Sequence, residues 1–267
     1  MFANIHASLI ISLILAGSQQ TNPVRTYPLA PDHSLTATKY IEKGMPANDR
    51  LWTGKDYAQA MSVLQTLAAG DPTTLPRYGS ATSGVVFARI VALDNFSLFP
   101  ATLTKQQRLM FAVSIMENLG QITILYSSVT TQAGVFDSEL VELLRYTLEL
   151  TRSVIQFMEA FLATLPADDP DRDVRAKGLG QMREGTASVV DGCLITLTEK
   201  KVYRSSELVR LADTLEATLP EIIKFLPAGA QQETPIRIQR LVEQESDAIL
   251  KERLIRIVAA LNKSKPR

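Results

Sequence analysis

The chain has 267 residues, enough for one large domain or two small ones, and 46% of its residues are hydrophobic, which is ample for a core. Its 28 basic and 28 acidic residues cancel, so net charge gives no reason to expect nucleic acid or an anionic membrane as a partner. Beyond residue 18 the only histidine is His33, and the only cysteine is Cys193. This composition argues against histidine-dependent hydrolases, His/Cys zinc sites and an intrachain disulfide.

Residues 1–18 form an apolar segment without Asp, Glu, Lys or Arg. The apolar run, residues 8–17, is short for a permanent membrane span, and it ends at Ala16, Gly17 and Ser18, small residues typical of a signal-peptidase site. We interpret the segment as a cleaved secretory signal and expect an exported protein, periplasmic or secreted, without a stable membrane span after cleavage. An uncleaved anchor is the alternative, because no Lys or Arg precedes the run.

Residues 19–49 contain four prolines and little apolar periodicity, which predicts an extended or disordered leader. Residues 50–267 are predicted to form a single all-α domain, with Thr53 as the N-cap of its first helix. Helices are expected at 56–69, 80–94, 104–131, 138–165, from the loop 166–173 to about 198, 205–226 with a kink at Pro220, and about 232–261. About seven helices with mostly short loops predict an antiparallel bundle or stacked hairpins.

An internal repeat is the most specific pattern. Residues 131–141 resemble 198–209 at an offset of 67 before the turn and 68 after it, and 147–149 (Thr-Leu-Glu) recur as 214–216. The pattern predicts a duplicated hairpin in the C-terminal two thirds, whose copies span about 110–165 and 177–226. Convergence of two amphipathic hairpins is the alternative explanation.

Each predicted copy has a serine just after its turn. Ser138 and Ser206 are candidate N-caps for the second helix of each hairpin.

A first candidate site precedes and enters the expected helix 80–94. Glycines and serines before a helix leave backbone N–H groups that can hold an anion, and an arginine can add a charged donor. The candidate ligand-binding residues are Arg77, Tyr78, Ser80, Ser83 and Arg89. The alternative is an ordinary loop and helix cap.

A second candidate site is a buried polar cluster. Glu117, Glu184 and Asp191 interrupt or flank apolar runs, and buried charges are costly unless they are paired. We therefore expect some of them to contact one another or an arginine among Arg145, Arg152 and Arg210. Structural pairing between helices is favoured over a ligand-binding or acid/base site.

Two further charged stretches are interpreted as ordinary solvated features. The loop with Asp168, Asp169, Asp171 and Asp173 lacks the spacing of a calcium loop, so no metal site is predicted. On the last predicted helix, acidic and basic residues four positions apart indicate stabilising pairs on a wet face, with Asp247/Lys251 and Glu252/Arg256 as examples.

The leading hypothesis is a non-catalytic exported helical protein that binds a protein partner, self-associates or acts as an assembly module; no cofactor is expected. One alternative is a carrier of a small apolar or amphipathic ligand held between helices, with a cavity near Phe111, Ile115, Ile122, Phe157 and Phe161. A further alternative is a carboxylate-dependent enzyme, for which Glu117 with Glu184 is the nominated pair.

Overall fold

The computed structural model describes residues 53–69, 104–164, 166, 168–170 and 172–263. Within these ranges the chain is all helical and contains no strand, which confirms the predicted fold class. The helices are α3 (Gly54–Ala68), α5 (Lys105–Val129), α6 (Asp137–Ala163), α7 (Arg172–Thr196), α8 (Ser205–Ile222), the 3₁₀ turn η4 (Ile223–Phe225), α9 (Ala228–Gln244) and α10 (Ala248–Lys263). The predicted signal, leader and helix 80–94 lie outside the described residues.

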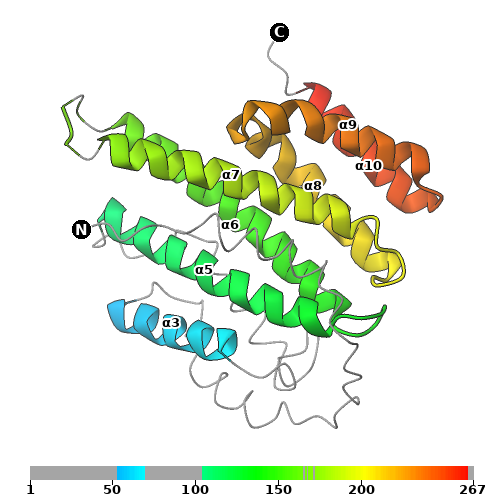
Figure 1. Cartoon of the computed structure of the whole chain (residues 1–267), viewed down its shortest axis with the longest axis horizontal. Helices are drawn as coiled ribbons and strands as arrows, with labels where there is room; N and C mark the ends of the chain where they lie inside the picture. The colour runs from blue at the N-terminus through cyan, green and yellow to red at the C-terminus, as the bar shows by residue number, and fades with distance from the viewer. Residues whose placement is uncertain (1–52, 70–103, 165, 167, 171, 264–267) are drawn as a thin grey trace.

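The helices form two rows, which we call the inner row (α6, α8 and α10) and the outer row (α5, α7 and α9). Figure 1 shows α5 and α7 on either side of α6. In the inner row α6 packs on α8 and α8 packs on α10, while α9 packs on α10, and α3 packs on α5. The described helices form a bundle in which α5–α6, α7–α8 and α9–α10, which we call the three hairpins, follow one another along the chain. α5 packs on α6 and α9 packs on α10, whereas α7 packs on α6 rather than on α8.

The inner row holds the centre of the core, because its helices have neighbours on several sides. α6 packs on α5, α7 and α8, so apolar side chains around most of its circumference are buried. Residues without exposed surface there include Val141, Leu143, Tyr146, Leu148, Leu150 and Val154 on α6, and Leu211, Leu215 and Leu219 on α8. Burial of such side chains is the main favourable contribution to folding.

The N-terminal ends of the helices agree only in part with the caps that the sequence predicted. Thr53 caps α3 as predicted, in a reciprocal capping box with Asp56. The cap predictions for Ser138 and Ser206 are wrong. α6 already begins at Asp137, after Phe136 in the left-handed region (φ 61°), and α8 begins at Ser205, so both serines lie inside the first turn.

The predicted final helix is two helices. The backbone of Glu245 is extended (ψ 126°), and the chain turns there between α9 and α10. Asp247 then caps α10, because its Oδ1 accepts hydrogen bonds from the N–H groups of Ile249 (2.9 Å) and Leu250 (3.1 Å). The pairing predicted for Asp247 with Lys251 is therefore replaced by a cap.

Pro220 lies near the end of α8 rather than at a kink in a long helix. Proline has no N–H for the helical hydrogen-bond ladder. α8 ends two residues later, at Ile222, and the chain continues as η4.

The turns of the three hairpins lie together at one end of the molecule, on the right in Figure 1. Charged and polar side chains tie them together, and we call this set the turn-end clasp: Asp137, Lys200, Arg204, Ser205, Glu245 and Asp247. Arg204 Nε donates to Asp137 Oδ2 (2.9 Å), Ser205 Oγ donates to Asp247 Oδ2 (2.5 Å), and Lys200 Nζ lies 2.6 Å from Glu245 Oε1. The clasp therefore fixes the register of all three hairpins.

Asp137 is the buried centre of the clasp, with its side chain only 1% exposed. Burial, the largest single influence, would raise the pKa of this carboxyl, but hydrogen bonds from Arg204 and from the Gly134 backbone outweigh it and hold the pKa below its ordinary value. In return, the hydrogen bond to Asp137 raises the pKa of Arg204. The pair therefore stays charged at neutral pH.

Candidate functional site

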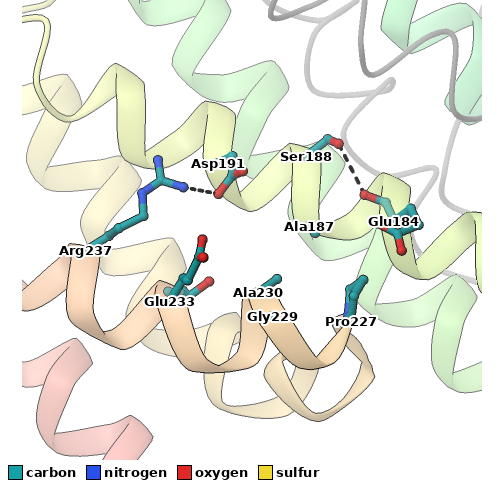
Figure 2. Close-up of a pocket in the computed structure, with 10 residues that line it drawn as sticks. Glu184, Ala187, Ser188, Asp191, Pro227, Gly229, Ala230, Glu233 and Arg237 are labelled. Carbon is teal, nitrogen blue, oxygen red and sulfur yellow. Dashed lines mark hydrogen bonds and ion pairs between the residues drawn. The ribbon is translucent and has the colours of Figure 1, made fainter.

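An open cleft of about 280 Å³ lies between α7 and α9, in the outer row. Figure 2 shows the two helices running side by side, with charged side chains along the gap. The cleft is lined by Glu184, Ala187, Ser188 and Asp191 from α7 and by Pro227, Gly229, Ala230, Glu233, Thr234 and Arg237 from the start of α9.

Small side chains form the walls of the cleft. Ala187 and Ser188 on α7 lie opposite Gly229 and Ala230 on α9. Small side chains between two helices leave space unless the helices approach each other closely, because a packed interface is filled by interlocking side chains. α9 instead rests mainly on α10, through buried residues such as Ile238 and Val242, and it touches α7 only lightly.

The cleft carries a surplus of negative charge. Arg237 Nη1 donates to Asp191 Oδ1, which neutralises one of its three carboxylates. Glu184 and Glu233 are exposed, and neither side chain has a partner within the described part of the chain. Two negative charges therefore face solvent along one gap.

The sequence placed Glu184 and Asp191 in a buried cluster, and the structure corrects this. Glu184 is exposed, because α7 packs on α6 with its other face and turns Glu184 toward the cleft. Asp191 is half-buried, and its partner is Arg237 rather than Arg145, Arg152 or Arg210. The third member, Glu117, lies on α5 at a position whose side chain is not described.

The arginines expected to pair with that cluster form a different network, between α6 and α8. Arg145 Nη1 lies 2.9 Å from Glu142 Oε2, Arg210 Nη1 lies 2.7 Å from Glu207 Oε2, and Arg210 Nη2 also contacts Glu142 Oε2. Arg145 Nε also donates to Thr214 Oγ1 (2.6 Å). The sequence did not single out these two glutamates, although each has an arginine three residues later, the spacing of a helical ion pair.

Arg152 lies near Glu221 instead, with Nη1 3.6 Å from Oε1. The first candidate site, Arg77, Tyr78, Ser80, Ser83 and Arg89, lies outside the described residues.

Two findings within the described residues concern groups that could take part in metal or thiol chemistry. No cluster of His, Cys, Asp and Glu in these ranges is arranged to hold a metal ion. Cys193 is fully buried, and burial raises the pKa of its thiol, so it remains a protonated core residue. The nominated acid pair, Glu117 and Glu184, belongs to α5 and α7: α5 packs on both α3 and α6, and α7 packs chiefly on α6.

Of the five residues named for a ligand carrier, the side chain of Phe111 is not described, and the other four do not line the cleft. Ile115 and Ile122 are buried in the hydrophobic core, whereas Phe157 and Phe161 are half-buried on α6. The cleft lies between α7 and α9 and is edged by charges, unlike the largely apolar pockets that hold small apolar ligands.

None of the helices in the described ranges combines the length and the apolar character needed to cross a bilayer. Comparison with known proteins finds no matching family model, no similar curated protein and no similar solved structure.

Proposed function

We propose that this chain is a non-catalytic protein that binds a protein partner, and that the cleft between α7 and α9 receives a basic segment of that partner. The observation that carries the proposal is the pair of unpartnered carboxylates, Glu184 and Glu233, on the two sides of an open gap. Opposite charge across an interface guides association and fixes which partner is accepted.

The size and walls of the cleft support a peptide segment as its occupant. A volume of about 280 Å³ accommodates one or two long side chains, and the small residues Ala187 and Ala230 let another backbone approach closely. A lysine or arginine there would form charge-assisted hydrogen bonds with Glu184 and Glu233.

Apolar side chains beside the cleft support the same proposal. Ile195 follows Asp191 by one turn of α7, and Ile236 directly precedes Arg237 on α9; they are 37% and 52% exposed. Interfaces combine a charged rim with apolar anchors. A basic amphipathic segment has both complementary features.

Site-specific photocrosslinking in the host cell tests the proposal. A photoreactive amino acid is placed at Ala230 in the cleft and, as a control, at the exposed Ala217 on α8. We expect a crosslinked protein adduct from Ala230 and none of the same mass from Ala217. The double variant Glu184→Lys/Glu233→Lys should remove the Ala230 adduct.

A charge-matched control separates the cleft from a general effect of net charge. Asp168 and Glu243 are exposed acidic residues outside the cleft. The double variant Asp168→Lys/Glu243→Lys should retain the adduct. An adduct that survives reversal of both cleft carboxylates, or no adduct from Ala230, would refute the proposal.

The duplicated hairpin and export remain parts of the proposal. α5 and α7 are both 25 residues long, and they begin at Lys105 and Arg172, which are 67 residues apart like the sequence repeat. Positions 67 residues apart are also buried in both helices: Ile115 and Met182, Leu119 and Thr186, Ile122 and Val189, Tyr126 and Cys193. Export is checked by N-terminal sequencing of the protein from its host, which should begin near Gln19.

A further inference from the structure

Among the described helices α10 is the last of the inner row, and its outward face carries two large exposed apolar side chains, Ile249 and Ile255, together with an ion pair. Leu250, Leu254, Ile257 and Leu261 bury the opposite face of the helix against the core. The outward face presents Ala248, Ile249, Glu252, Ile255, Arg256 and Ala259, all exposed, with Ile249 at 59% and Ile255 at 49%. A terminal helix of a helical stack normally presents a polar face to water.

The charges on this face are self-complementary under a two-fold axis. Glu252 and Arg256 are one turn apart, and within one chain Arg256 Nη2 donates to Glu252 Oε1 (2.5 Å). When two copies of α10 lie antiparallel and cross at the level of residue 254, Glu252 faces Arg256 of the partner subunit, and the second such pair follows by symmetry. The same register places the large Ile249 opposite the small Ala259 of the partner subunit.

We propose that this chain forms a two-fold symmetric homodimer through the outward face of α10. The inner row α6–α8–α10 then continues into the inner row of the second copy, and Ile255 is buried beside the axis. This surface is separate from the cleft between α7 and α9. A result that refutes the dimer therefore leaves the proposal of partner binding unaffected, and the reverse also holds. A single helix pair is a small interface, for which a weak and concentration-dependent dimer is expected.

Sedimentation velocity of the purified protein, from about 1 to about 100 µM, tests the proposal. The mass should rise toward twice that of the monomer with concentration. Ile255→Asp should leave only monomer, because it places two like charges beside the axis. Val174→Asp on α7, where the apolar side chain is also exposed (55%), is the matched control and should leave the dimer intact.

A charge-swap series distinguishes a specific interface from nonspecific association. Glu252→Arg and Arg256→Glu should each weaken the dimer by roughly tenfold or more, because each replaces two attractive pairs with two repulsive ones. An equimolar mixture of the two single variants should form a mixed dimer, and the variant with both changes should dimerise alone. Circular dichroism verifies that each variant is folded.

Three results would overturn the proposal: a monomer at every concentration, a dimer that Ile255→Asp does not weaken, or an equimolar mixture that associates no better than its components.

Discussion

The contact between α6 and α8 and the gap between α7 and α9 each join two successive hairpins, but they do so in opposite ways. In the inner row, leucines such as Leu211 and Leu215 have no exposed surface, and the glutamates between the helices share arginines. In the outer row, alanines and glycine line an open cleft with one ion pair, between Asp191 and Arg237. The difference indicates that the inner row holds the hairpins together and leaves the outer row free to bind.

The turn-end clasp explains how the gap can persist. It ties the hairpin turns through Asp137–Arg204, Ser205–Asp247 and Lys200–Glu245. α7 and α9 are therefore held near their C-terminal ends. The cleft lies farther from the clasp, along the first part of α9 and beside Glu233.

The largest expected effect is the loss of core packing in the inner row. Leu211→Ala should lower the free energy of unfolding by about 2–5 kcal/mol, because Leu211 is completely buried and the cavity cannot collapse fully. Ile236→Ala on the outer row should change it by less than about 0.5 kcal/mol. Urea unfolding monitored by circular dichroism measures both. Equal losses of unfolding free energy for Leu211→Ala and Ile236→Ala would contradict the difference in packing between the inner and the outer row.

The second largest effect on stability is expected from the turn-end clasp. Asp137→Asn should cost about 2–3 kcal/mol at pH 7, because Arg204 loses its charged acceptor at a buried position. Since the pKa of Asp137 is lowered in the folded protein, its contribution is complete above the unfolded pKa of about 3.9 and is lost as pH falls through the folded pKa. The difference between wild type and variant should therefore shrink below about pH 4.

The control for that pH dependence is Asp173→Asn, at an exposed position on α7. A stability difference for Asp137→Asn that stays constant down to about pH 2 would contradict the assigned role of the carboxylate.

Equivalent ion pairs in the two rows sharpen the comparison. Glu142→Gln, which removes the acceptor shared by Arg145 and Arg210, should cost about 1–2 kcal/mol, because the side chain of Glu142 is only 7% exposed. Asp191→Asn in the cleft should cost about 0–1 kcal/mol, because both members of its pair are about one third or more exposed. Thermal unfolding at low and high salt measures both losses of stability. A larger loss for Asp191→Asn than for Glu142→Gln would contradict the conclusion that the inner row, and not the outer row, holds the fold together.

The smallest effect on stability is expected from the cleft carboxylates. Glu184→Lys/Glu233→Lys should change the free energy of unfolding by less than about 0.5 kcal/mol, because neither side chain has a partner in the described structure. Denaturant titration checks this beside the crosslinking experiment. Destabilisation beyond about 1 kcal/mol would mean that the carboxylates support the fold rather than a partner.

The sequence predicts the long helices well, because their apolar periodicity extends over many turns. The ends of α5 and α6 lie within two residues of the predicted bounds. The break between α9 and α10 was missed, because Asp247 fits both an i,i+4 pair and an N-cap. Only the extended backbone at Glu245 decides between them.

The cleft could be predicted only in part. Glu184 and Asp191 were recognised as unusual charges, but they were assigned to the interior, because helical periodicity does not reveal that α7 has a neighbour on one face and a gap on another. The sequence did not single out Glu233 or Arg237. Their position at the cleft depends on how α9 lies beside α7, which no local pattern encodes.

Native-state hydrogen exchange of the purified protein tests the contrast between the two rows most directly. Amides in the middle of α6 and α8 should exchange only through global unfolding, whereas those of Glu233 and Thr234, beside the cleft, should exchange through openings of lower free energy. Protection of the first half of α9 that equals that of α6 and α8 would contradict the account, because the outer gap would then be as firmly closed as the inner row.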